Sequence, residues 1–253
     1  MLPPIINMKI STGILLIVFT LLPTVCAKAQ NDSLRRRAFW GASISAPGSS
    51  PGATVRRVET DSPAARAGLR QGDVITQMNG REMTDPITYA ATYRAVRAGD
   101  RVDLRVVRQG QTLSLQLVPT PLAHETVEGV DVTYGSVVTE RGHRLRTLIT
   151  KPGGASGRRL PAIVFVQWLS CDSVEVLNNP SDGVEKTLRF LASKSGFVLM
   201  RVERPGLGDS EGPDCSQSDL QADLAGFRAA LAALKSHDSV DTNNLFIYGA
   251  SIG

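Results

Sequence analysis

The sequence has few cysteines, few histidines and little net charge, and each shortage narrows the choice of function. Its 253 residues include three cysteines and three histidines, and their spacing indicates no metal or cofactor site, so we expect neither. The formal net charge is +4 and falls to +2 when the two lysines of the first 29 residues are set aside. So small and scattered a charge does not indicate binding to nucleic acid.

Long apolar runs are also missing, except for one near the N-terminus. Lys9 precedes a mostly apolar run over residues 14–22, and the small residues Ala27 and Ala29 follow it. This order is typical of a cleaved secretory signal, so we predict a signal peptide over residues 1–29 and a periplasmic or secreted protein. The alternative is an uncleaved anchor, but the run is shorter than the roughly 20 residues of a spanning helix. We therefore expect no stable membrane span after cleavage.

Export would place the two cysteines of the mature chain, Cys171 and Cys215, outside the reducing cytoplasm. Disulfides form and persist outside the cytoplasm, so the simplest hypothesis pairs these two thiols. The alternative is two buried, unpaired cysteines. Alkylation without reductant, followed by mass measurement, distinguishes the two.

Residues 38–118 are predicted to form a first domain of short strands with one longer helix. The strands are expected over residues 54–58, 73–78, 101–107 and 112–117, with turn signals between them. The longer helix is expected over residues 86–97, with Asp85 as its N-cap and Gly99 as its end. A shorter helical turn is expected over residues 63–67.

Two segments of this domain, residues 61–75 (DSPAARAGLRQGDVI) and 78–80 (MNG), resemble the PDZ domains of bacterial envelope proteases. The resemblance implies an α+β domain that binds the C-terminus of a peptide or protein as an added strand. The carboxylate is then held by backbone N–H groups of an apolar-Gly-apolar loop. The loop is matched by Phe39, Trp40, Gly41 and Ala42, with three arginines just upstream as candidate charge partners. The alternative is a PDZ fold that acts only as a spacer.

Residues 119–125 form a predicted proline-containing linker, and the pattern changes after it. Strands are expected over residues 130–138, 145–150, 162–166, 197–202 and 245–248, and helices over residues 184–193 and 219–234. The runs at 162–166 and 197–202 are apolar apart from Arg201, which is typical of strands buried on both faces of a parallel sheet. A turn is expected over residues 241–244.

The last five residues, 249–253, match the pattern G-x-S-x-G directly after a predicted apolar strand. In such a turn the backbone of the serine is strained and its neighbours pack closely, which is why glycines flank it. The serine here is Ser251, and the backbone N–H of Ile252 is placed to donate to an oxyanion. Ser251 is therefore the candidate nucleophile.

The order of elements, together with residues 201–210 (RVERPGLGDS), resembles the first half of an α/β-hydrolase domain. The resemblance implies an incomplete α/β-hydrolase-type domain over residues 126–253, with a mostly parallel sheet and helices, after the α+β PDZ domain. It assigns Ser251 as nucleophile and the backbone N–H of Ile252 as one oxyanion donor, with the backbone N–H of Leu169, or alternatively of Trp168, as the other. A disulfide between the two cysteines would brace the rim of that site.

The triad of this family places an acid and a histidine after the serine, whereas the three histidines of this chain all precede Ser251. We therefore predict an exported serine hydrolase with a PDZ domain, acting on a small ester, amide or peptide substrate and present here as an inactive N-terminal fragment. The alternative is a non-catalytic envelope PDZ protein that binds peptide or protein C-termini.

Overall fold

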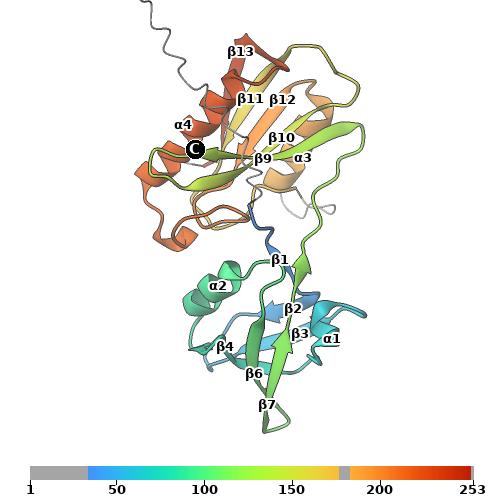
Figure 1. Cartoon of the computed structure of the whole chain (residues 1–253), viewed down its shortest axis with the longest axis vertical. Helices are drawn as coiled ribbons and strands as arrows, with labels where there is room; N and C mark the ends of the chain where they lie inside the picture. The colour runs from blue at the N-terminus through green and yellow to red at the C-terminus, as the bar shows by residue number, and fades with distance from the viewer. Residues whose placement is uncertain (1–33, 177–182, 252–253) are drawn as a thin grey trace, which may run out of the picture. The chain divides into compact units, whose positions relative to one another are not determined.

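The computed structural model describes residues 34–176 and 183–251 (Figure 1). The predicted signal peptide, residues 1–29, lies outside this part of the chain. The described residues belong to one compact unit, which contains two larger sheets and a two-stranded ribbon. Within the described ranges, no helix combines the length and the apolar character that crossing a membrane requires.

The first larger sheet has the strand order β2-β3-β4-β6-β7, with β5 paired to β4, and all of its pairings are antiparallel. Its strands are β2 (Ala42–Ser45), β3 (Ala53–Val58), β4 (Val74–Met78), β5 (Arg81–Glu82), β6 (Val102–Arg108) and β7 (Gln111–Leu117). In this order β2 has one neighbour, β3, so its other edge is free to pair with an added strand.

Two helices accompany this sheet, α1 (Pro63–Arg66) and α2 (Pro86–Ala95). The predicted N-cap of α2 is confirmed, because Asp85 accepts hydrogen bonds from the backbone N–H groups two and three residues further on, both at 2.9 Å. The helix ends at residue 95 rather than at residue 97, where the prediction ended it. Val96 adopts extended backbone and is buried in the core of this sheet, so the helix cannot continue through it.

A short ribbon joins the start of the described chain to the predicted linker. Strand β1 (Ala38–Phe39) pairs antiparallel with β8 (Thr120–Pro121). The predicted linker over residues 119–125 therefore contains a strand, and it also contains the fully buried side chain of Glu125.

The second larger sheet has the strand order β13-β11-β12-β10-β9. Its strands are β9 (Val130–Val138), β10 (Arg144–Pro152), β11 (Leu160–Val166), β12 (Val198–Val202) and β13 (Val240–Gly249). Helices α3 (Gly183–Lys194) and α4 (Leu220–Lys235) pack on it, and a 3-10 helix, η1 (Cys215–Gln217), precedes α4. Because side chains alternate along β11, Val164 packs in the cluster with α4 and Phe165 packs in the cluster with α3.

The predicted fold class is wrong for the second region, which we define as the part of the chain that carries this second sheet, from β9 to β13. Strand β11 is parallel to β12 and β13, but β10 is antiparallel to both β9 and β12. Among the described strands, eight pairings are antiparallel and two are parallel. Continuous apolar runs report burial on both faces and not strand direction, so they do not justify a mostly parallel, α/β-hydrolase-type sheet.

The predicted turn over residues 241–244 lies inside β13 rather than before a shorter strand. The register with β11 shifts from Leu160 opposite Val240 to Ala162 opposite Leu245, so the turn residues form an irregularity in the strand. The side chain of Asp241 accepts hydrogen bonds from two of the following residues, at 3.0 and 2.7 Å, which stabilises this local bend.

Candidate peptide-binding groove and candidate nucleophile

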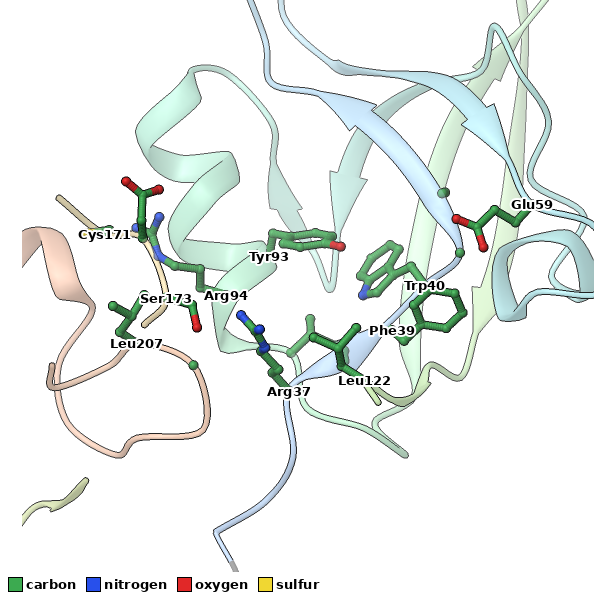
Figure 2. Close-up of a pocket in the computed structure, with 16 residues that line it drawn as sticks. Arg37, Phe39, Trp40, Glu59, Tyr93, Arg94, Leu122, Cys171, Ser173 and Leu207 are labelled. Atoms are coloured by element: carbon green, nitrogen blue, oxygen red, sulfur yellow. The ribbon is translucent and has the colours of Figure 1, made fainter. Parts of the chain in front are cut away.

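The four residues of the predicted peptide-binding loop lie together on one cavity. The loop runs from β1 to the free edge strand β2. It lines a cavity of about 350 Å³ with all four of its residues, Phe39, Trp40, Gly41 and Ala42. Tyr93, in the last turn of α2, lines the same cavity (Figure 2). The structure thus places the loop, the sheet edge and the longer helix around one groove.

The conformation of this loop requires glycine at position 41. Gly41 has φ of +68°, and a Cβ atom built there would lie 2.2 Å from the Cβ of Ser62, the N-cap of α1. The carbonyl of Trp40 accepts from the N–H of Ala64 at 2.9 Å, and the carbonyl of Gly41 accepts from that of Glu59 at 2.8 Å. In the described part of the chain, no hydrogen bond uses the N–H of Trp40 or Gly41. Two adjacent backbone donors are therefore available to a ligand.

Aromatic side chains form the floor and the helix side of the groove. Trp40 is 1% exposed, and its ring centroid lies 5.0 Å from that of Tyr93. Burial raises the pKa of Tyr93, so its hydroxyl stays protonated at neutral pH. The indole Nε1 of Trp40 has no hydrogen-bond partner among the described residues, and neither has the Nε of Arg37, which lines the same cavity.

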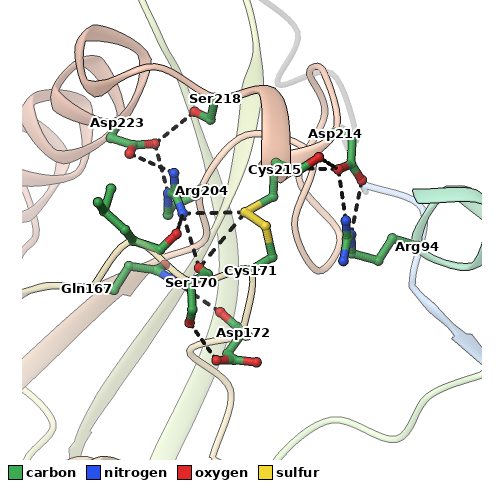
Figure 3. Close-up of a disulfide and its surroundings, with 12 residues drawn as sticks. Arg94, Gln167, Ser170, Cys171, Asp172, Arg204, Asp214, Cys215, Ser218 and Asp223 are labelled. Carbon is green, nitrogen blue, oxygen red and sulfur yellow. Dashed lines mark hydrogen bonds and ion pairs between the residues drawn. A yellow bond between two sulfur atoms is a disulfide. The ribbon is translucent and has the colours of Figure 1, made fainter. Parts of the chain in front are cut away.

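Residues from the second region complete the cavity. The loop after β11 contributes Cys171, Asp172 and Ser173. Cys171 forms a disulfide with Cys215, and the residue before Cys215, Asp214, pairs with Arg94 of α2 through two hydrogen bonds of 2.8 and 3.0 Å (Figure 3). The disulfide therefore links the cavity-lining loop, which contains Cys171, to the segment of Asp214 and Cys215, which contacts α2.

Two arginines just before the loop are bound by carboxylates of the second region. Arg36 pairs with Glu175 at 2.7 Å and with Asp209 at 3.1 Å, and Arg37 also pairs with Glu175. The backbone N–H of Arg37 donates to Asp209 at 2.7 Å, and Arg146 donates to the same carboxylate at 3.0 Å. The charges of Arg36 and Arg37 are thus engaged by the protein itself rather than free for a ligand carboxylate.

A buried carboxyl group lies behind the cavity wall. Glu203 is 1% exposed, and burial raises its pKa to about 7, although Ser173 donates a hydrogen bond that favours the charged form. Sequence reasoning did not single out Glu203, Glu175 or Ser173, because their partners lie far away along the chain.

The candidate nucleophile lies at the end of β13. Ser251 is exposed and has φ of +62°, a conformation that is rare for residues other than glycine. The preceding N–H, of Ala250, donates to the carbonyl of Val166 at 3.0 Å. Because β11 and β13 are parallel neighbours, Ser251 and Leu169 follow strands that end at the same sheet edge.

One of the two predicted oxyanion donors, Leu169, belongs to the described residues. Leu169 is 55% exposed, and its carbonyl accepts a hydrogen bond from Arg204. Ile252 lies outside the described residues. Within those residues, no hydrogen bond, ion pair or ring contact joins Ser251 to a histidine. His124 stacks on the ring of Tyr134, and the other two histidines follow β9 and α4 in the chain.

Comparison with protein families identifies the first region. The model of the PDZ domain family matches residues 30–118. The predicted PDZ domain is therefore confirmed, and its loop is the one that lines the cavity described above.

Curated relatives are proteases by name, and the DegP-like ones are named as periplasmic. A probable periplasmic serine endoprotease, DegP-like, of Pseudomonas fluorescens is 32% identical over 172 residues, covering 61% of this chain and 36% of the relative. The corresponding Brucella suis protein is 26% identical over 191 residues, covering 74% and 33%. The magnetosome formation protease MamE of Paramagnetospirillum magneticum is 27% identical over 208 residues, covering 78% and 25%. The chain thus spans between a quarter and about a third of the length of these relatives.

Solved structures with partial similarity include the HtrA-type protease AlgW with a decapeptide, at 28% identity, a TM-score of 0.31 and coverage of 36% of this chain and 31% of that one. The HtrA3 PDZ domain bound to a phage-derived ligand is 24% identical, with a TM-score of 0.30 and coverage of 34% and 88%. The two DegP-like relatives are named as serine endoproteases and not as α/β-hydrolases, in keeping with the correction of the fold class. The predicted destination is confirmed: the protein is periplasmic or secreted, as its relatives are.

Proposed function

We propose that this exported protein binds the C-termini of peptides or proteins in the groove between β2 and α2. The observation that carries the proposal is the pair of unused backbone N–H groups at Trp40 and Gly41, beside an edge strand with a free side. A ligand chain that pairs with β2 brings its terminal carboxylate to these two donors. Hydrogen bonds from backbone N–H groups to a carboxylate are charge-assisted and are roughly twice as strong as neutral ones.

The test compares peptides that differ only at the terminal group. A peptide selected from a C-terminal library is titrated into the full chain as the free acid and as the amide, with binding followed by fluorescence polarisation. Hydrogen bonds to charged groups contribute about 1.5–3 kcal/mol, so we expect the amide to bind about 10- to 100-fold more weakly. Equal affinity for the two forms would support the spacer alternative instead.

A pair of glycine variants localises the binding. Gly41→Ala introduces a Cβ atom into the contact with Ser62 and is expected to abolish binding, whereas Gly110→Ala is expected to retain it. Gly110 lies in the turn between β6 and β7, has a similar φ of +79° and has nothing within 4 Å of the added atom. Both variants therefore place alanine at a positive φ, which costs a similar amount of stability. Only Gly41→Ala also creates a steric clash, with Ser62 next to the loop of the groove.

A second proposed function is serine hydrolysis at Ser251, on a small ester, amide or peptide substrate. The positive φ of this residue favours it, because strained backbone is concentrated at functional sites. The relatives named as serine endoproteases favour an exported serine protease that also has a PDZ domain. The backbone N–H groups of Ile252 and Leu169 remain the proposed oxyanion donors.

Labelling of the protein by a fluorophosphonate probe tests this second function. We expect wild-type protein to be labelled, Ser251→Ala to lose the label and Ser43→Ala to keep it, since a serine hydroxyl reacts only when a base activates it. Ser43 is the matched control because it lies in the same tetrapeptide, Gly-Ala-Ser-Ile. Labelling that survives Ser251→Ala refutes the assignment, and wild-type protein that takes no label supports the non-catalytic alternative.

A further inference from the structure

We infer that the disulfide between Cys171 and Cys215 is a redox-active site, which a dithiol opens by attacking the sulfur of Cys171 and releasing Cys215 as a thiolate. The inference goes beyond the proposed peptide binding and hydrolysis and depends on neither of them. Three observations carry it: the two cysteines differ in burial, a guanidinium contacts the sulfur of Cys215, and the segments that the bond joins are also held together by hydrogen bonds.

The two cysteines differ in their exposure to solvent. Cys215 is 2% exposed, whereas Cys171 is half-buried and lines the cavity described above. Attack on a disulfide requires access of the thiolate to the sulfur with which it reacts. Cys171 is therefore the member of the pair that is more open to attack, and the leaving group is Cys215.

A cation lies beside the buried sulfur. The Nη1 of Arg204 donates a hydrogen bond to the Sγ of Cys215 at 3.4 Å (Figure 3). A neighbouring arginine stabilises a thiolate, and a thiol that ionises readily is the better leaving group in disulfide exchange. The negative charge that forms on Cys215 is thus stabilised by a donor that is already in place.

The acidic side chains around Cys215 are engaged by arginines. Asp214, which precedes it, pairs with Arg94 at 2.8 Å. Asp223, on α4, pairs with Arg204 at 2.9 Å, and both partners of this pair are buried. The pair holds the guanidinium in its position next to the sulfur. Neither carboxylate is thus left unpaired beside the thiolate that forms.

The sulfur of Cys171 is in a different environment. In the described part of the chain, it takes part in no hydrogen bond or ion pair. The next residue, Asp172, is exposed, and its carboxylate accepts from the hydroxyl of Ser170 at 2.5 Å. A negative charge is therefore less well stabilised on Cys171 than on Cys215, which gives the cleavage a direction.

The exchange transfers two electrons in two steps. A thiolate of the dithiol first attacks the Sγ of Cys171, a new S–S bond forms, and the electron pair of the broken bond leaves with Cys215. The second thiolate of the dithiol then attacks its own sulfur in this mixed disulfide and releases Cys171, which takes up a proton. The dithiol is oxidised to a disulfide, and the protein disulfide is reduced to two thiols, with Cys215 partly ionised.

Hydrogen bonds keep the two segments together when the bond opens. Arg204 donates to the carbonyl of Leu169 at 2.5 Å and to that of Ser170 at 3.1 Å, directly before Cys171. The same guanidinium contacts Cys215 on the other side. The two thiols therefore stay neighbours in the reduced protein, and the bond can close again. The site is thus reversible.

The first test compares the ionisation of the two thiols in the full chain. The ultraviolet absorbance of the thiolate is followed in Cys171→Ser, which retains Cys215, and in Cys215→Ser, which retains Cys171. The double variant Cys171→Ser, Cys215→Ser supplies the background. At pH 7 the ionised fraction of Cys215 is expected to exceed that of Cys171 by about 8-fold or more. Equal fractions, or a larger fraction for Cys171, would overturn the inference.

The second test removes the guanidinium together with its counterion. Arg204→Met with Asp223→Leu is expected to slow the opening of the disulfide by dithiothreitol by about 3-fold or more, because the leaving thiolate loses its donor. Arg201→Met with Glu125→Leu is the matched control and is expected to keep the wild-type rate. It removes another buried ion pair, whose hydrogen bonds among the described residues involve neither cysteine. An unchanged rate in the first variant contradicts the inference.

A third measurement uses the wild-type protein alone and does not depend on the folding of any variant. The protein is exposed briefly to glutathione and quenched with acid, and mass spectrometry of its peptides locates the mixed disulfide. We expect glutathione on Cys171 in most of the adduct. Removal of the reductant is expected to restore the bond between the two cysteines. Glutathione chiefly on Cys215, or a bond that opens only when the protein is unfolded, would show that the inference is wrong.

Discussion

Replacing Glu125 by alanine is expected to lower the free energy of unfolding by about 3–5 kcal/mol, because it leaves a buried guanidinium without its counterion. The side chains of Glu125 and Arg201 form an ion pair and are both 0% exposed. Arg201 also donates to Glu125 through a second nitrogen at 2.9 Å, and the N–H of Val176 donates to the same carboxylate at 2.6 Å. Urea denaturation followed by circular dichroism measures the change.

Two further variants show whether the loss comes from the unpaired charge. The double variant Glu125→Leu with Arg201→Met removes both charges and is expected to recover most of the stability, since apolar replacement of a buried pair is often neutral. Arg141→Ala removes an exposed pair with Asp219, whose side chains are 42% and 61% exposed, and is expected to change stability by about 0.5 kcal/mol or less. A loss below about 1 kcal/mol for Glu125→Ala would contradict the buried pairing.

Removing the disulfide is expected to lower the free energy of unfolding by about 4 kcal/mol, since the bond restricts the unfolded chain over a long loop. Cys171 and Cys215 are separated by 44 residues in sequence. Denaturation of wild type with and without reductant is compared with that of the double variant Cys171→Ser, Cys215→Ser.

The double cysteine variant is also the control for the reductant. Reductant is expected to lower the stability of wild type to that of the double variant and to leave the double variant unchanged. If wild type is alkylated at both cysteines before any reductant is added, the thiols are unpaired and the prediction is wrong.

The sequence predicts local structure well because local signals act over a few residues. Asp85 caps α2 as predicted. Asp219, which was predicted as the first residue of its helix, is the N-cap of α4 and accepts from the N–H of Ala222 at 2.6 Å. The PDZ domain was identified because its motif is continuous. The loop from Phe39 to Ala42 lines the cavity, and its role in peptide binding stays a prediction. These features depend on neighbours in the chain.

Strand direction and buried ion pairs could not be predicted, because they depend on residues far apart. Apolar runs showed that β11 and β12 are buried, but they gave no signal that β10 would be antiparallel to β12. Glu125 was placed in a linker, although its partner Arg201 lies 76 residues further on. The residues that complete the cavity, such as Ser173, come from a loop whose sequence has no binding motif.

The segment from Arg36 to Trp40 has a consequence for how the groove and the second region influence each other. Arg36 and Arg37 are bound by Glu175 and Asp209, and the backbone continues directly from them into the loop that lines the cavity. A rearrangement that releases these arginines would therefore alter the loop, and a ligand that favours one loop conformation would favour the matching state of the carboxylates. The short arginine segment thus connects the groove to the carboxylates of the second region through a few residues of backbone.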